Sequence, residues 1–137
     1  MAVVIQEMVD AEAAGVLFSR NPIDGDPSKI VITANFGLGE SVVSAKSDPD
    51  TIIVEKCYGK SAQGLKILQK KCGLKSKKIV MNDTETIEID LDESAASNIA
   101  VNDDMILRLA KLSIILETEF GSSRDIEFAI IKVSMSY

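Results

Sequence analysis

The sequence contains no histidine and no tryptophan, and aromatic residues make up only 4% of its 137 positions. The lack of histidine excludes Ser-His-Asp and Cys-His catalysis, histidine-ligated zinc and a phosphohistidine carrier within this chain. Any catalysis would have to use carboxylates, amides, lysine, arginine or a metal ion held by oxygen atoms. The scarcity of aromatic side chains predicts an aliphatic core built from Ile, Val, Leu and Met.

Cysteine is also scarce, because only Cys57 and Cys72 are present. The two do not form a Cys-x-x-Cys pair, so neither a zinc site nor a thioredoxin-like site is indicated. Two reduced thiols of an intracellular protein are the simpler expectation, and a single disulfide is the alternative.

The chain has no long apolar run and no basic amino-terminal stretch. A bilayer-spanning helix needs about 20 consecutive apolar residues, and a signal peptide begins with positive charge. We therefore expect no membrane partner, and a cytoplasmic location is the default expectation. The formal charge of −6 disfavours nucleic acid as a partner but is compatible with a nucleotide held in a local pocket with a metal ion.

The residues that are present indicate an ordered domain, or part of a larger one, with 46% hydrophobic and 26% charged residues. Runs rich in β-branched residues predict strands at residues 3–9, 16–18, 29–35 and 51–56, with residues 10–15 as a connection. Their close spacing favours antiparallel hairpins over crossover units. Alternation over residues 80–89 predicts a further strand or hairpin with one face toward solvent.

One long helix is predicted from Asn102 to Phe120. Asn102 is a good N-cap, Asp103 and Asp104 suit the first turn, and Gly121 is suited to ending the helix. Apolar residues recur at helical spacing between these ends. A strand over residues 124–131 follows, which gives an α+β domain with a mainly antiparallel sheet and one long helix.

From Tyr58 to Lys78 the secondary-structure pattern is weak. Six of the lysines lie between Lys66 and Lys78, and the simplest interpretation of this run is a solvated face or a linker. Cys72 and Gly73 interrupt any long helix there.

The first candidate for chemistry is the pair Asp125 and Glu127. Residues two apart in a strand project from the same face, and two carboxylates suit a hard cation such as Mg²⁺. From spacing alone, a solvent-facing strand with charged residues is the simpler alternative.

Three weaker candidates precede this pair. Gly37 and Gly39 would let backbone approach a phosphate, but Val42 takes the place of the third small residue of a dinucleotide fingerprint, and an ordinary turn is the alternative. Arg20 stands before a turn, where it suits either a phosphate or a surface ion pair. Gln6 could pair with a base edge or with backbone.

Taken in order, several blocks of the sequence resemble the nucleotide-binding domain of phosphoenolpyruvate synthase, which pyruvate phosphate dikinase and rifampicin phosphotransferase share. The blocks are residues 2–9, 14–22, 34–44, 49–51, 120–121 and 125–130. The resemblance implies an ATP-grasp fold, in which ATP lies between two α+β subdomains, and this chain resembles the C-terminal one. Residues 1–137 would form a single partial domain, with residues 58–101 as a divergent, insert-like segment.

The resemblance also implies roles for individual residues. Gln6 matches the hinge glutamine near the adenine, and Glu127 matches the carboxylate that holds Mg²⁺ and the ATP phosphates, with Asp125 as its partner. Three further residues fall in family motifs that line the cleft, and these are Arg20 as a phosphate contact, Asn35 and Glu40. The implied cofactor is Mg²⁺ with ATP, and the implied chemistry is phosphoryl transfer by positioning and charge neutralisation.

The chain also departs from the family. A Leu-Gln-x-Arg-Pro segment should follow the Asp-x-Glu strand, but residues 131–137 contain neither that Gln nor that Arg. The first ATP-grasp subdomain and the phosphohistidine domain, which passes the phosphate to pyruvate, would be separate partners. We therefore expect a fragment that cannot complete the reaction alone, so its status as an enzyme stays open. The alternatives are a non-catalytic binding module, a fragment of an antibiotic kinase like rifampicin phosphotransferase, and a structural remnant without ligand.

Overall fold

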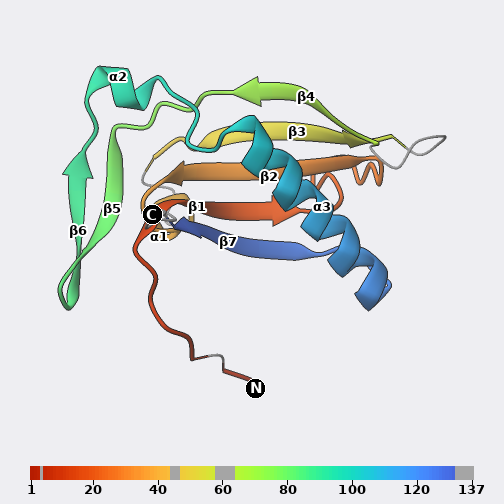
Figure 1. The fold of residues 1–137 in the computed structure, drawn as a ribbon, viewed down its shortest axis with the longest axis horizontal. Helices are drawn as coiled ribbons and strands as arrows, with labels where there is room; N and C mark the ends of the chain where they lie inside the picture. Colours follow the sequence, from red (N-terminus) through yellow and green to blue (C-terminus); the bar gives the residue numbers. More distant parts are fainter. Residues whose placement is uncertain (4, 44–46, 58–63, 132–137) are drawn as a thin grey trace, which may run out of the picture.

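Figure 1 shows a five-stranded antiparallel sheet with one long helix across one face and a separate hairpin at one end. The computed structural model describes residues 1–3, 5–43, 47–57 and 64–131. The strand order of the large sheet is β4-β3-β2-β1-β7, and β5 pairs with β6 alone. The strands are β1 (Ala11–Phe18), β2 (Lys29–Phe36), β3 (Asp50–Lys56), β4 (Leu65–Lys71), β5 (Lys77–Asn82), β6 (Glu85–Asp90) and β7 (Asp125–Ile131). The helices are α1 (Glu40–Val43), α2 (Glu93–Ala96) and α3 (Asp103–Phe120).

The long helix α3 begins and ends where the sequence predicts. The Asn102 side chain accepts a hydrogen bond of 2.9 Å from the backbone N–H of Met105, which satisfies one of the free donors of the first turn. Gly121 ends the helix with a φ of 69°, a left-handed conformation that glycine adopts without strain. The expected α+β fold with a mainly antiparallel sheet and one long helix is confirmed.

The main core lies between α3 and the sheet. Ile30, Ile32, Ile52 and Val54 alternate along β2 and β3, and all four are fully buried with Ile106 of α3. Such alternation is what a strand needs when only one of its faces packs against a helix. The core is aliphatic, as the composition predicts.

The opposite face of the sheet carries a smaller cluster formed by Ala11, Ala14, Leu38 and Ile79. This cluster attaches the β5–β6 hairpin to the loop after β2, where the backbone N–H of Leu38 donates a hydrogen bond of 2.8 Å to the carbonyl of Ile79. Gly37 makes the contact close, because a Cβ atom at this position would lie 2.1 Å from the carbonyl oxygen of Ile79. The glycine therefore serves the packing of backbone against backbone.

The beginning of the chain differs from the sequence prediction. Residues 1–3 and 5–10 form no strand, Val4 lies outside the described residues, and the first strand begins at Ala11 instead of within residues 3–9. The predicted connection at residues 10–15 was therefore wrong, because most of it belongs to β1. Small residues are needed there, since a Cβ atom on Gly15 would lie 1.9 Å from the carbonyl oxygen of Thr33 on β2. Close packing of neighbouring strands outweighs the low strand propensity of Ala and Gly.

The lysine-rich segment also departs from expectation at one residue. Lys75 is fully buried and forms an ion pair with Asp50, whereas Lys66, Lys70 and Lys71 are exposed on the edge strand β4. The carboxylate of Asp50 also accepts hydrogen bonds from two backbone N–H groups, those of Gly73 at 2.9 Å and Ala100 at 2.7 Å. The interpretation as a solvated face or linker was therefore wrong for Lys75, whose charge is compensated inside the protein.

The state of the two cysteines and the length of the helices also bear on the sequence predictions. Cys57 and Cys72 are both free and exposed, so the expectation of unpaired cysteines is confirmed. Within the described ranges, no helix is both long and apolar enough to cross a membrane.

Candidate functional site

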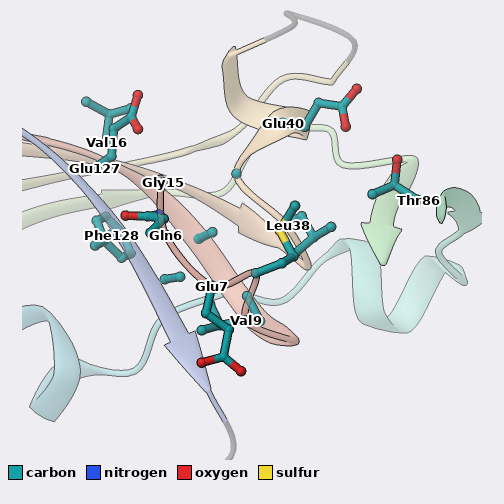
Figure 2. Close-up of a pocket in the computed structure, with 15 residues that line it drawn as sticks. Gln6, Glu7, Val9, Gly15, Val16, Leu38, Glu40, Thr86, Glu127 and Phe128 are labelled. Carbon is teal, nitrogen blue, oxygen red and sulfur yellow. The ribbon is translucent and has the colours of Figure 1, made fainter. Parts of the chain in front are cut away.

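A cavity of about 370 Å³ lies on the face of the sheet opposite α3 (Figure 2). Five parts of the chain line it: the amino-terminal segment, the middle of β1, the loop that leads into α1, the hairpin strand β6 and the strand β7. The lining residues include Gln6, Gly15, Glu40, Thr86, Glu127 and Phe128.

The strand β7 places Glu127 on the cavity wall. The exposure of the side chains alternates along β7. Asp125 and Glu127 are exposed on one face, and Ile126 and Phe128 pack against the main core from the other. The two carboxylates therefore share a face, as their spacing predicts. Glu127 lines the cavity opposite Val16 of β1, whereas Asp125 lies farther along the sheet, opposite Phe18, and is not among the lining residues.

Gln6 and Glu40 reach the same cavity from other parts of the chain. Gln6 lies in the extended amino-terminal segment and lines the cavity together with Gly15 and Phe128, which Figure 2 labels. Glu40 begins α1, whose first turn is fixed when Ser41 donates a side-chain hydrogen bond of 3.0 Å to the carbonyl of Leu38. Three of the predicted site residues, Gln6, Glu40 and Glu127, thus converge on one cavity.

Asn35 and Arg20 lie outside this cavity lining. Asn35 is fully buried, and its amide donates hydrogen bonds to the hydroxyl of Ser47 at 2.7 Å and to the carbonyl of Lys77 at 3.5 Å. In this structure Asn35 holds the start of β5 against β2. Arg20 is exposed just after β1, and no ion pair between described residues includes it.

Thr86 is a lining residue that the sequence did not single out. Alternating apolar residues predicted the hairpin around it, but no local pattern says where a hairpin docks. The only sequence signal for that docking was Gly37, whose missing side chain makes room for β5. The structure gives Gly37 this internal contact, and a phosphate-binding role for it stays a prediction.

The charge of the cavity is negative. Glu7, Glu40 and Glu127 line it, and none of the described residues that line it is a lysine or an arginine. No ion pair between described residues neutralises Glu40 or Glu127. An anionic ligand would therefore need cations to bind here.

The donor atoms of the cavity suit a hard cation, because they are carboxylate oxygens. Within the described residues, no group of three or more His, Cys, Asp or Glu side chains could hold a metal ion by itself. Mg²⁺ often binds through one or two carboxylates and completes its octahedral shell with water and ligand oxygens. The residues present fit that mode, with Glu127 as the carboxylate on the cavity wall.

Comparison with known proteins gives a family match over almost the whole chain. Residues 1–135 match the model of the pyruvate phosphate dikinase AMP/ATP-binding domain. A probable phosphoenolpyruvate synthase of Archaeoglobus fulgidus is 34% identical over 95% of this chain. An uncharacterized phosphotransferase of Bacillus subtilis is 35% identical over 95% of the chain, and the phosphoenolpyruvate synthase of Pyrococcus furiosus is 31% identical over 96%.

These relatives are much longer than the present chain. The matched region is 16% of the Archaeoglobus protein, 15% of the Bacillus protein and 16% of the Pyrococcus protein. The chain thus spans less than a fifth of the length of the curated relatives it matches.

Proposed function

Because the chain belongs to the pyruvate phosphate dikinase AMP/ATP-binding domain family, we propose that its cavity is one half of an ATP-binding site. The observation that carries the proposal is the convergence of Gln6, Glu40 and Glu127, which come from distant parts of the sequence, on one cavity. The chain would serve as the ATP- and Mg²⁺-binding part of a phosphotransferase similar to phosphoenolpyruvate synthase.

Two residues of the proposed site have chemistry suited to different parts of ATP. The amide of Gln6 can both donate and accept a hydrogen bond, as recognition of an adenine edge requires. Glu127 would hold Mg²⁺ through a carboxylate oxygen, with Asp125 on the same face as a second oxygen donor. Bound Mg²⁺ would supply the positive charge that lets phosphate oxygens enter a cavity lined by carboxylates.

The described residues that line the cavity include no lysine or arginine, so the cationic groups of the site would come from elsewhere. Phosphoryl transfer needs cationic groups that stabilise the charge of the transferred phosphate. We propose that these groups come from the first ATP-grasp subdomain, and that a separate phosphohistidine domain accepts the phosphate and carries it toward pyruvate. The chain has no histidine to take that role.

The same lack of cationic groups favours a second candidate, a binding module without catalysis. In that case the cavity binds nucleotide or pairs with another chain, and no phosphate is transferred. The two candidates share the nucleotide site and differ in whether a partner subdomain restores turnover.

Isothermal titration of Mg·ATP into the purified chain tests the nucleotide site, with Mg²⁺-free ATP and Mg²⁺ alone as comparisons. We expect weak binding that depends on Mg²⁺, and little binding of Mg²⁺ alone, since no complete set of metal ligands exists among the described residues. We expect no turnover by the chain alone.

The matched variants are Glu127→Gln on the cavity wall and Glu119→Gln on α3, because both residues are exposed glutamates outside every ion pair between described residues. Glu127→Gln should remove the dependence of ATP binding on Mg²⁺, and Glu119→Gln should leave it unchanged. Circular dichroism verifies that both variants are folded. If Glu127→Gln binds Mg·ATP like the unaltered chain, the metal-binding role proposed for Glu127 is wrong.

A further inference from the structure

We propose that the outer face of α3 is a surface through which two copies of this chain associate, with the two helices packed antiparallel about a two-fold axis. The occupant of the surface is a second copy of the chain, because the charges and apolar side chains of this face are complementary to themselves. The inference is independent of the proposed nucleotide site, since α3 and the cavity lie on opposite faces of the sheet.

The first argument is exposure of apolar side chains. Leu112, Ile115 and Phe120 are 47%, 57% and 63% exposed, whereas Ile106 and Leu109 on the other side of the helix belong to the main core. No other helix or strand of the described chain lies over the outer side of α3 in Figure 1. Neighbouring exposed apolar side chains often mark a contact between proteins.

The second argument is the pattern of one stripe along this face. Arg108, Leu112, Ile115 and Glu119 are separated by four, three and four residues, a spacing that keeps side chains on one side of an α-helix. All four are exposed. The stripe therefore begins with a positive charge, continues through two apolar residues and ends with a negative charge.

The third argument is that an antiparallel copy of the stripe matches the first at each position. A two-fold axis midway between residues 113 and 114 places Leu112 of each copy opposite Ile115 of the other. The same axis places Arg108 of each copy opposite Glu119 of the other. The interface then has apolar pairs at its centre and ion pairs at its rim. A parallel pair would instead place Arg108 beside Arg108 and Glu119 beside Glu119.

The charged ends of the stripe are available for such pairs. Arg108 contacts Asp104 at 3.0 Å one turn earlier, but these side chains are 71% and 74% exposed, and an ion pair so open to solvent is weak. No ion pair between described residues includes Glu119. One helix face is small beside the roughly 800 Å² per partner of a standard stable interface, so we expect a weak dimer that dissociates on dilution.

Analytical ultracentrifugation of the full chain over a wide range of concentrations tests the proposal, with circular dichroism to verify that each variant is folded. The unaltered chain should shift from monomer to dimer as its concentration rises. Arg108→Glu alone and Glu119→Arg alone each place like charges at both rim contacts, and each should weaken the dimer by about tenfold or more. An equimolar mixture of these two variants should recover the affinity, because in the mixed dimer both rim contacts again join opposite charges.

A pair of matched isoleucine variants tests the apolar centre. Ile115→Gln should weaken the dimer by about tenfold or more, since the glutamine side chain would have to lose its hydration. Ile23→Gln is the control, because Ile23 is 92% exposed in the turn before β2, away from α3, and it should leave the dimer unchanged.

Three results would overturn the proposal. A folded chain that stays monomeric at every concentration has no self-complementary surface on α3. A dimer that Ile115→Gln does not weaken forms through another surface. Failure of the mixed charge variants to recover the affinity that each has lost would show that the two helices do not pack in the antiparallel register.

Discussion

The two faces of the five-stranded sheet differ in whether their charged side chains form ion pairs within the protein. On the α3 side and at its margins, the charged groups that are buried have partners inside the protein, as in the ion pairs of Lys56 with Glu117 and of Lys75 with Asp50. On the cavity side, Glu40 and Glu127 are exposed, and no ion pair between described residues includes them. The difference separates the residues that stabilise the fold from those of the proposed nucleotide site, so we expect that each set can be altered with little effect on the other.

The largest expected effect comes from breaking the buried pair. Asp50→Asn leaves the ammonium of Lys75 buried without a counter-charge and should lower the free energy of unfolding by about 3–5 kcal/mol. Urea unfolding followed by circular dichroism suits this measurement, because the chain lacks tryptophan. Asp48→Asn is the matched control, since Asp48 is exposed two residues earlier, and it should have almost no effect.

The double variant Asp50→Asn with Lys75→Met sharpens this prediction. It removes the uncompensated charge, so it should recover part of the stability lost in Asp50→Asn. A double variant less stable than Asp50→Asn alone would contradict the explanation by charge.

The next effect concerns packing on the α3 face. Ile106 is fully buried, so Ile106→Ala should lower the free energy of unfolding by about 2–5 kcal/mol through lost burial and a residual cavity. Leu112 on the same helix is 47% exposed, and Leu112→Ala should cost about 1 kcal/mol or less. Similar losses for the two variants would show that α3 packs on the sheet through a different face.

Replacing a glycine on the cavity side should lower the free energy of unfolding by a smaller amount. Gly37→Ala combines a φ of 76° with a contact to the carbonyl of Ile79, and the backbone strain alone should cost about 1–3 kcal/mol. A Cβ atom on Gly39 would lie 3.7 Å from that of Ala14, an ordinary contact, so Gly39→Ala should be nearly neutral. Hydrogen exchange of the β5–β6 hairpin should increase in Gly37→Ala and stay unchanged in Gly39→Ala.

The smallest expected effect on stability comes from the ionisation of Asp26, in the turn before β2. Hydrogen bonds from the Ser28 hydroxyl, then from Lys29 and from the Ser28 backbone, lower the pKa of Asp26 to about 2. Because this pKa lies below that of the unfolded chain, the stabilisation is complete above the unfolded value and disappears as the pH falls through about 2. NMR titration should show that Ser28→Ala raises the pKa of Asp26 more than Lys29→Met does, and the reverse order would contradict this assignment.

The sequence predicted elements whose signals are local. Asn102 and Gly121 mark the ends of α3 through hydrogen-bond and backbone requirements of their own positions. The strand predicted at residues 3–9 was wrong because a strand also needs a partner strand. Residues 3–9 have the composition of a strand, but the alanine-rich segment after them is the one that pairs on both sides, with β2 and β7.

The site was predictable only in part, because some of its residues have a local sequence signal and others depend on how distant segments pack together. Glu127 and Asp125 carry a local spacing signal, and Gln6 is a weak candidate from its amide side chain alone. Asn35 and Glu40 are indicated only by the family resemblance. Of the predicted residues, Gln6, Glu40 and Glu127 line the cavity, and the roles proposed for all of them stay predictions. Thr86 had no such signal, because its place depends on how the hairpin docks.

The position of β7 in the sheet has a consequence for the order of folding. Strands β1 to β4 pair with their neighbours in sequence, but β7 joins β1 only after the whole intervening chain, so that Gly15 lies opposite Phe128. Contacts between such distant residues carry a high loop-closure entropy and form slowly. We expect the meander of β1 to β4 to form first and β7 to pair with β1 in the last step. A partly folded chain would then contain part of the main core before the carboxylate of Glu127 reaches the cavity.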